Sequence, residues 1–597
     1  MTPTPIPEHG TSLKLIEGGL TAIAIALAFC WPKFGAAFFS RIERGFAQLA
    51  RKKGLAVIAV GLTAILLRLA ILPLVPVPHP FSPDDFSFLL AGGTFASGRL
   101  TNLTPAMWQH FESIHITMQP TYMSMYFPAN GLVLAAGKVL FGHPWFGLLL
   151  MTGLMCAAIT WMLQAWLPPT WALLGGVLAI VRLGLFSYWI NTYSGAASTS
   201  ALGGALVLGA LPRFIKTAQL RYGLLMSVGV ILLATSRPYE GVLLCVPVAI
   251  VLGRWAFFGK NRPSMRAVLR ATALPLALIV VAGAWMGYYD YRAFGNPLTP
   301  PYKVDRAAYA VAPYYVWQSQ RPEPVYRHAV LRDFYCRYEI YDIGHIQSLS
   351  HFLPQTLIKG ARAIYFFAGI ALLPPLIMLR RVLADRRIRF LLLAVLVLAA
   401  GMVIEIFLFP HYIAPFTAAF YAIGLQAMRH LRVWKPKDQP VGTALVRLAV
   451  TVCFVLGVLR VCAEPLHVTI RKSDTTQIWY GTGEFGTARA QVESELERLP
   501  GRQIVLVRYS PTHDPMDEWV YNSPDIDNSK VIWAREMDGA NNLELIRYYK
   551  DRKVWLVQPD LQPAGLSPYS LPAANAAGLA MDSTSATKNE KKVQQGG

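Results

Sequence analysis

Two adjacent carboxylates, Asp84 and Asp85, stand in the stretch "PHPFSPDDFSFLLAGG", which begins at Pro78 and directly follows an apolar run. A carboxylate near the hydrocarbon edge of a bilayer costs free energy unless it is solvated or paired with a cation. Where such a residue is present, a role in binding or catalysis is a common reason. Ser-Pro-Asp-Asp suits a solvated turn, and it also suits a carboxylate that takes a proton from a substrate hydroxyl. The loop that continues to Gly131 is rich in aromatic and polar residues. Such a surface suits a sugar or a lipid phosphate at the headgroup level, which favours the catalytic interpretation of both aspartates.

A substrate linked through phosphate would also need cations or hydrogen-bond donors for the anion that leaves. Three segments supply candidates, namely "SRPYEG", "PPYKVDRAAY" and "FPHYIAP". Their candidate binding residues are Arg237, Glu240, Lys303, Arg306, His411 and Tyr412. A structural alternative for Arg237 is an ion pair with Glu240 in the turn of a helical hairpin. Arg182 lies inside an apolar run and needs a partner. Glu405 is a candidate partner for Arg182 or for Arg237.

His110, Glu112 and His115 are the residues that could hold a divalent metal, but the pattern favours ordinary polar residues of a loop. Sequence motifs of nucleotide-binding loops, zinc proteases, paired CxxC sites and serine hydrolases are not found. We therefore predict no metal and no cofactor.

The elements that position these residues are membrane helices. The chain has 597 residues, of which 54% are hydrophobic and 15% charged, so the bilayer must be the solvent for most of it. Apolar runs long enough to span predict about twelve helices. Their ranges are roughly 13–33, 54–76, 143–165, 168–188, 191–212, 222–236, 239–258, 267–289, 357–379, 390–408, 412–428 and 443–463.

The net charge of +21 is carried by clusters between these runs, which indicates membrane orientation rather than nucleic-acid binding. The five clusters are Arg41 to Lys53, Arg213 to Arg221, Gly259 to Arg270, Arg380 to Arg389 and Arg429 to Lys437. With the ranges above, all five fall on one side, which the positive-inside rule assigns to the cytoplasm. The loops at about 77–142 and 290–356, and everything after about 464, then lie outside.

We therefore divide the chain into a membrane domain over 1–465, a small α/β domain over 466–560 and a disordered tail over 561–597. The second unit is predicted from helices at "RAQVESELERLP" and "NLELIRYYK" that alternate with apolar strands at "RQIVLVRY", "SKVIWARE" and "RKVWLVQPD". The fold class is thus a mainly α, polytopic membrane protein with a small extracytoplasmic α/β domain.

An apolar span, an acidic pair in the first outer loop, further spans and a soluble outer end resemble the GT-C glycosyltransferases. The similarity is greatest to the bacterial dolichyl-phosphate-mannose-like and aminoarabinose-transferase-like members, and it covers about Lys53 to Arg429. These families usually carry Asp-Glu, so Asp84 matches their essential aspartate, while Asp85 departs from the pattern. "MYFPANG" keeps Tyr126 and Pro128 of a family segment but has Phe127 in place of a proline.

The resemblance implies a multi-pass enzyme of the bacterial cytoplasmic membrane with its C-terminal domain outside. Such enzymes move a sugar from a polyprenyl phosphate to an acceptor, typically with inversion. Asp84 would be the general base, and Tyr126 would join the substrate-binding residues. The acceptor, whether lipid, glycan or protein, is left open.

Two other functions fit the same composition. A transporter or flippase of lipid-linked sugars would carry charges at the membrane midplane. A non-catalytic envelope scaffold would share the fold and bind a partner through the C-terminal domain.

Overall fold

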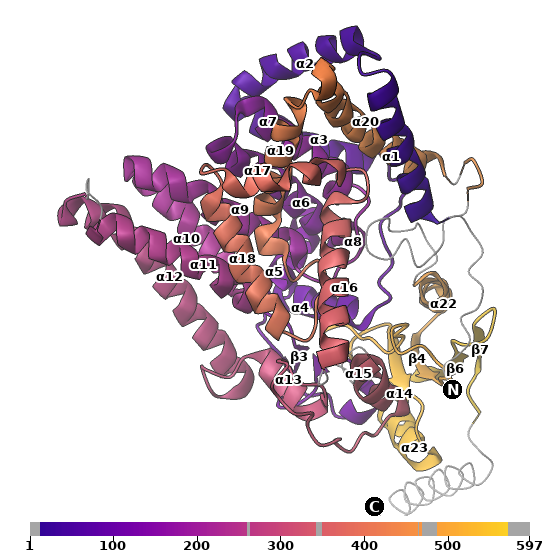
Figure 1. Ribbon diagram of the computed structural model, residues 1–597. Helices are drawn as coiled ribbons and strands as arrows, with labels where there is room; N and C mark the ends of the chain where they lie inside the picture. Colours follow the sequence, from indigo (N-terminus) through magenta and orange to yellow (C-terminus); the bar gives the residue numbers. More distant parts are fainter. Residues whose placement is uncertain (1–11, 259–262, 342–348, 464, 469–485, 571–597) are drawn as a thin grey trace, which may run out of the picture.

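The computed structural model describes residues 12–258, 263–341, 349–463, 465–468 and 486–570. Helices dominate, and they form a bundle above a small C-terminal domain (Figure 1). The helices of the N-terminal half are α1 (Leu13–Cys30), α2 (Ala36–Arg51), α3 (Lys53–Ala70), α4 (Pro83–Ala96), α5 (Pro128–Phe141), α6 (Trp145–Trp166), α7 (Pro169–Ala179), α8 (Tyr188–Asn191), α9 (Ala197–Thr217), α10 (Leu220–Ala234), α11 (Pro238–Gly253) and α12 (Met265–Phe294). Those that follow are α13 (Pro301–Tyr309), α14 (Ala329–Asp333), α15 (Glu339–Tyr341), α16 (Leu349–Ala368), α17 (Leu379–Ala384), α18 (Arg389–Ile404), α19 (Thr417–Arg432), α20 (Val441–Cys462), α22 (Thr487–Arg498) and α23 (Gly539–Tyr548).

A helix lies within each of the twelve ranges predicted to span. Among the described residues, seven helices are long and apolar enough to cross a membrane, or eight if the bent pair of Pro374–Ala384 and Arg389–Ile404 is one span. The apolar helices α7 and α10 are shorter than a bilayer requires, so the count of twelve stays a prediction. The predicted membrane-protein class is confirmed by these helices.

The packing differs between the centre and the rim of the bundle. In α9, glycines let neighbouring backbones approach: a Cβ on Gly204 would lie 1.7 Å from the carbonyl oxygen of Pro415, and one on Gly203 would lie 3.0 Å from that of Gly229. The stretch "GGALVLG" thus serves helix packing. At the rim, α12 exposes large apolar side chains such as Val280 and Val281, which is the arrangement that lipid favours.

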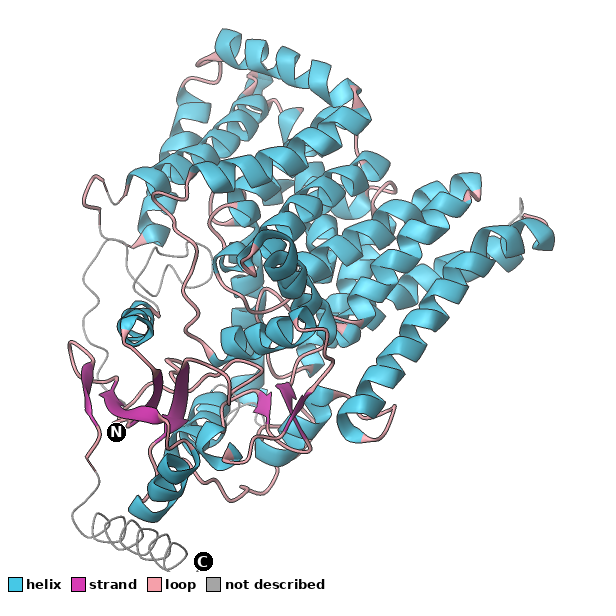
Figure 2. Ribbon diagram, turned by 180° about the vertical axis from the view of Figure 1, so that it is seen from behind, coloured by secondary structure: helices cyan, strands magenta, loops and turns pink. Residues whose placement is uncertain are grey.

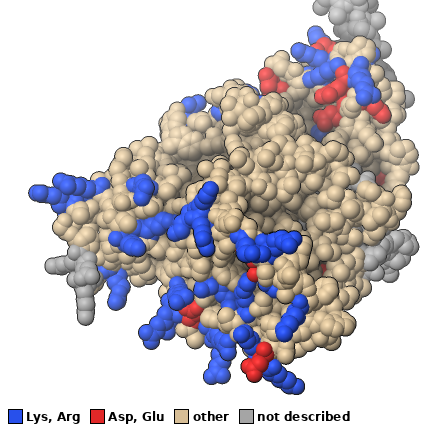
Figure 3. All heavy atoms as spheres, turned by 90° about the horizontal axis from the view of Figure 1, so that it is seen from above, with Lys and Arg blue, Asp and Glu red and all other residues tan. Residues whose placement is uncertain are grey.

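The two ends of the bundle differ in charge. Figure 1 places α2 and α17, which carry two of the basic clusters, at the end away from the C-terminal strands. Figure 3 looks onto that end and shows many Lys and Arg side chains with few acidic ones. This charge asymmetry is the one on which the predicted orientation depends.

The C-terminal domain contains a four-stranded sheet in the order β5-β4-β6-β7, flanked by α22 and α23 (Figure 2). The strands are β4 (Arg502–Val507), β5 (Val531–Arg535), β6 (Arg552–Gln558) and β7 (Gly565–Pro568). Strand β4 is parallel to β5 and β6, as helices between strands predict, and β7 is antiparallel to β6.

Strand β7 was predicted to be part of a disordered tail, and this boundary is wrong. Residues 565–568 form backbone hydrogen bonds with β6, which outweigh the weak strand signal of Gly565 and Pro568. The remainder of the predicted tail, from 571, lies outside the described residues.

The first outer loop folds into a platform beside α4. Its three short strands, β1 (Asn102–Leu103), β2 (Ile116–Thr117) and β3 (Thr121–Ser124), pair antiparallel in the order β1-β3-β2. The C-terminal domain docks on this loop: Tyr122 donates its hydroxyl to the carbonyl of Asn522 (2.9 Å), and the ring of Phe86 stacks on Tyr521 with 4.6 Å between centroids.

Candidate functional site

The acidic pair begins a helix and is not a turn. Ser82 is the N-cap of α4, Pro83 is the first helical residue, and Asp84 and Asp85 follow in the first turn. Ser82 Oγ accepts from the Asp85 backbone N–H (3.2 Å), while the Asp85 carboxylate accepts from the Ser82 N–H (3.4 Å). This reciprocal cap explains why the local sequence leaves the apolar run and turns at once into a helix.

Asp85 is fully buried and holds a neighbouring segment in place. Its Oδ1 accepts from the backbone N–H of Tyr193 (2.8 Å), 108 residues later in the chain. Burial raises the pKa of Asp85 to about 6, although the backbone donors of Tyr193 and Phe81 oppose the shift. These contacts hold the start of α4 against the segment at Tyr193.

Asp84 is half-buried and has two partners on one oxygen. His115 Nδ1 donates to Asp84 Oδ1 across 2.6 Å, and the Tyr126 hydroxyl donates to the same oxygen. Burial alone would raise the pKa of Asp84, but the charge and hydrogen bond of His115 and the bond from Tyr126 hold it at about 2. Among the described residues, none forms a hydrogen bond with Oδ2, so this oxygen is left for a substrate.

His115 was considered only as a metal ligand, and its contact with Asp84 was missed. Its backbone has φ of 62°, in the left-handed region that non-glycine residues rarely adopt. The carbonyl of His115 accepts from Ser87 Oγ (2.6 Å) and from the Met125 N–H (3.2 Å), which fix this conformation. Strained backbone of this kind is frequent at functional sites, but its position is not visible from residue types alone.

Arg237 lies at the turn between α10 and α11, as predicted. Its guanidinium is 4.2 Å from the centre of the Tyr412 ring. It donates to the carbonyl of Gly195 (3.3 Å) and lies 3.9 Å from the buried Glu240 carboxylate. Both polar contacts are long, so the guanidinium keeps capacity for a further anion.

His411 lies beside the same glycine. A Cβ on Gly195, which has φ of +84°, would lie 3.0 Å from the His411 ring. The Tyr188 hydroxyl accepts from the His411 backbone N–H (3.0 Å) and donates to its Nδ1 (2.8 Å). Burial, together with the charge of Arg237, holds the pKa of His411 well below its usual range. The neutral ring is therefore favoured, and with Nδ1 accepting from Tyr188 it would present an Nε2–H donor.

The acidic and the cationic groups meet through one short segment. Tyr193 contacts Asp85, and Gly195 contacts both Arg237 and His411. Two residues along a chain separate Cα atoms by at most about 7–8 Å. The charge of Asp84 also affects the pKa of His411. The structure thus brings Asp84, Asp85, Tyr126, Arg237, His411 and Tyr412 together.

The two cations of the second outer loop are placed differently. Arg306 is buried and forms a two-fold ion pair with Glu339 (2.5 and 3.4 Å), and it also donates to the carbonyl of Ala312. Lys303 is exposed on α13. The structure therefore gives Arg306 an internal partner that the sequence did not reveal. Asp305, beside Arg306, is fully buried. Burial raises the pKa of Asp305 to about 6, although the charge of His115 opposes the shift.

The three metal candidates are separated. His110 contacts the carbonyls of Arg535 (2.9 Å) and Asn541 (3.2 Å) in the C-terminal domain. Glu112 accepts from Tyr309 (2.9 Å) and Arg327 (3.3 Å), both in the second outer loop. In the described part of the chain no group of three His, Cys, Asp or Glu is placed to hold a metal ion.

Glu405 is not the partner of Arg182. The Arg182 guanidinium lies 3.5 Å from the carboxylate of Glu17 in α1, and both side chains are buried. A residue near the N-terminus reaches this arginine instead. The other candidate partner of Glu405 was Arg237: burial raises the pKa of the Glu405 carboxyl, and the charge of Arg237 opposes the shift.

No protein-family model matches the sequence, and no curated protein is similar to it. Among solved structures, the oligosaccharyltransferase of Archaeoglobus fulgidus is similar over 84% of this chain and 68% of that chain, with 10% identity and a TM-score of 0.45. ArnT from Cupriavidus metallidurans in the apo state is similar over 84% and 92%, with 12% identity and a TM-score of 0.48. The archaeal oligosaccharyltransferase AglB in complex with an inhibitory peptide and a dolichol-phosphate is similar with 9% identity, coverage of 84% and 69%, and a TM-score of 0.41.

Proposed function

We propose that this protein is an integral membrane glycosyltransferase of the GT-C type. It moves a sugar from a polyprenyl-phosphate donor to an acceptor hydroxyl at the outer face of the cytoplasmic membrane of a bacterium. Asp84 is the general base, Asp85 positions the helix that carries it, and Arg237 and His411 bind the donor phosphate. The C-terminal domain lies on the outer side, where it covers the first loop.

The reaction is a single displacement. The acceptor oxygen forms a bond with the anomeric carbon, the bond from that carbon to the phosphate oxygen breaks, and the hydroxyl proton passes to Asp84 Oδ2. The configuration at the anomeric carbon inverts. Because the phosphate leaves as an anion, it needs the charge of Arg237 and the Nε2–H of His411 rather than a strong acid.

The low pKa of Asp84 affects when the proton moves. A carboxylate of pKa about 2 is ionised at every physiological pH but is a weak base. The proton therefore transfers late, when the attacking hydroxyl has become acidic. His115 holds Oδ1, which directs Oδ2 to the acceptor.

One observation carries the proposal: the segment from Tyr193 to Gly195 joins the acidic helix start to both donor-phosphate candidates. A base on one side and an anion site on the other are what a sugar-phosphate substrate requires. A solvated turn would show neither the convergence nor the paired Asp84 oxygen.

The test uses the full chain in membrane vesicles with a panel of radiolabelled polyprenyl-phosphate sugars and an extract of envelope acceptors. We expect release of polyprenyl phosphate together with labelled product for at least one sugar, and loss of both in Asp84→Asn. Movement of the intact donor across the bilayer without cleavage would instead establish the transporter. Asp84→Asn with full turnover, or wild type without cleavage of any donor in the panel, would overturn the proposal.

A further inference from the structure

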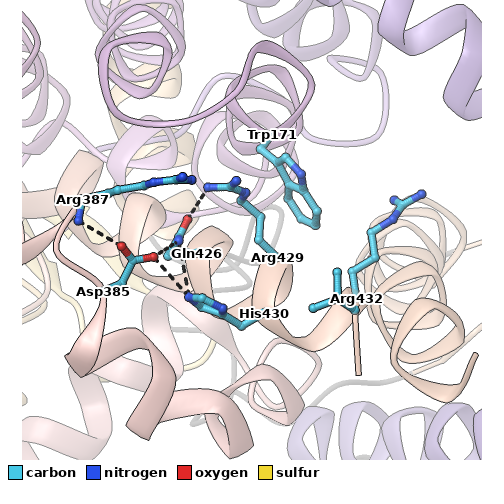
Figure 4. A pocket seen from close by; sticks show the side chains of 8 residues that line it. Trp171, Asp385, Arg387, Gln426, Arg429, His430 and Arg432 are labelled. Carbon is cyan, nitrogen blue, oxygen red and sulfur yellow. Dashed lines mark hydrogen bonds and ion pairs between the residues drawn. The ribbon is translucent and has the colours of Figure 1, made fainter. Parts of the chain in front are cut away.

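A cavity lies on the basic end of the bundle, away from the site described above. Its volume is about 530 Å³, and its lining residues come from α7, α19 and the turn that follows α17 (Figure 4). They are Trp171, Asp385, Arg387, Gln426, Arg429, His430, Arg432 and Val433. Two of the five basic clusters thus meet at one hollow.

Among the described residues, Asp385 is the only carboxylate that lines this cavity, and it already has hydrogen-bond partners. Asp385 accepts from the backbone N–H of Arg387 (2.9 Å), from His430 (3.2 Å) and from the side-chain amide of Gln426. It forms no ion pair with the guanidinium of Arg387 or of Arg429 among the described residues. The aspartate therefore orders the wall of the cavity, and its charge only partly offsets the repulsion between the two arginines.

Arg387 and Arg429 point their guanidinium groups toward one another (Figure 4). Arg429 donates to the neutral Gln426 (2.6 Å), and Arg387 is exposed. Burial and the charge of Arg387 lower the pKa of Arg429, as like charges at close range require. Arg432 adds a third cation, although it is shared with Glu43 (2.8 Å).

Orientation signals and helix dipoles explain part of this arrangement. Arg429, His430 and Arg432 lie in the last turn of α19, where cations are favourable. Neither effect explains why two arginines face each other across a hollow when solvent is available to both. An anion placed between the two arginines offsets the repulsion between their charges. It also accepts hydrogen bonds from both guanidinium groups.

We propose that this cavity binds a phosphate group, supplied either by an anionic lipid headgroup or by a soluble phosphate ester. Trp171 stands beside Arg429, and an indole at this depth is suited to the membrane interface. Basic hollows between the ends of membrane helices suit lipid phosphates, so the lipid is the favoured source. The site does not depend on the proposed transferase activity.

The experiment measures binding by the detergent-purified full chain. Titrations with phosphatidylglycerol, with phosphatidylcholine and with glycerol 3-phosphate are followed by thermal unfolding and by native mass spectrometry. The test variant is Arg387→Gln/Arg429→Gln. The matched control is Arg381→Gln/Arg386→Gln, which removes two exposed cations outside the cavity lining.

We expect phosphatidylglycerol to stabilise the wild type and the control more than phosphatidylcholine does. In the test variant the apparent affinity should fall by about tenfold or more, since hydrogen bonds between charged groups are worth ~1.5–3 kcal/mol. The ligand-free test variant should unfold at the same temperature as the wild type or higher, because a repulsion is removed. A shift with glycerol 3-phosphate that matches the lipid assigns the site to soluble esters. Equal binding by test and control variants, or no preference for the anionic compounds, overturns the proposal.

Discussion

His115 and Asp84 lie in direct contact, with Nδ1 2.6 Å from Oδ1, although 31 residues separate them along the chain. Tyr126 closes the group, since its hydroxyl donates to the same carboxylate oxygen and lies 3.2 Å from His115 Nδ1. Its ring stacks on Phe88, with 4.2 Å between centroids. The carboxylate is therefore fixed from one side and open on the other, which is the arrangement that a directed base requires.

Replacing Asp84 tests the base. Asp84→Asn keeps the size of the side chain but removes the proton acceptor, so turnover should fall by about 10²- to 10⁴-fold. The measurement is sugar transfer in vesicles at saturating donor. The matched control, Asp551→Asn, alters an exposed carboxylate that lies 3.7 Å from Arg502, and it should keep wild-type turnover.

Removing either partner of Asp84 should change the pH dependence of transfer. The pKa of Asp84 is about 2 because His115 and Tyr126 stabilise its charge. In His115→Gln or Tyr126→Phe that pKa moves up toward the ordinary value near 4, so the carboxylate is protonated at higher pH. The acidic limb of the kcat/KM profile should therefore move to higher pH. A limb that is identical in wild type and both variants would show that Asp84 does not titrate in catalysis.

Asp85 should control stability rather than chemistry. Its folded-state pKa of about 6 exceeds the unfolded value near 4, so its contribution to stability is full below pH 4 and is lost as pH rises toward 6. Asp85→Asn mimics the protonated form, so its stability should not fall between pH 4 and 6 as that of the wild type does. Thermal unfolding between pH 4 and 7.5, compared with wild type, measures the difference. Transfer by Asp85→Asn should stay within about tenfold of wild type. A loss as large as that of Asp84→Asn would reverse the roles of the two aspartates.

The phosphate candidates should act together. Arg237→Gln or His411→Gln should each raise the KM for the donor, and the double variant should lose less than the product of the two effects, because both contact Gly195 and one ligand. Arg332→Gln, which removes an exposed cation that is paired with Glu323 (2.5 Å), serves as the control. If the donor KM is unchanged in both single variants, Arg237 and His411 do not bind the donor.

The sequence predicted the helical membrane class, the strands β4, β5 and β6, and the segments around Asp84, Arg237 and His411. Apolar runs, the alternation of apolar and polar residues, and charged residues in loops are all local features of the sequence. They are sufficient to predict these elements. The contact between His115 and Asp84 depends on a left-handed residue and on pairing between β2 and β3, which no local pattern specifies. The ion pair of Arg306 with Glu339 was missed for the same reason, because the partner is 33 residues away.

The proposed function requires Asp84 and the C-terminal domain to lie on the outer face of the membrane. In a background without the native cysteines, Ser97→Cys and Thr512→Cys should react with an impermeant maleimide in intact cells. Lys437→Cys, in a basic cluster, should react only after the membrane is opened. Labelling of Lys437→Cys in intact cells would place the basic end outside. Labelling of only one of the first two positions would contradict the docking of Tyr122 on Asn522, which requires both regions on one side.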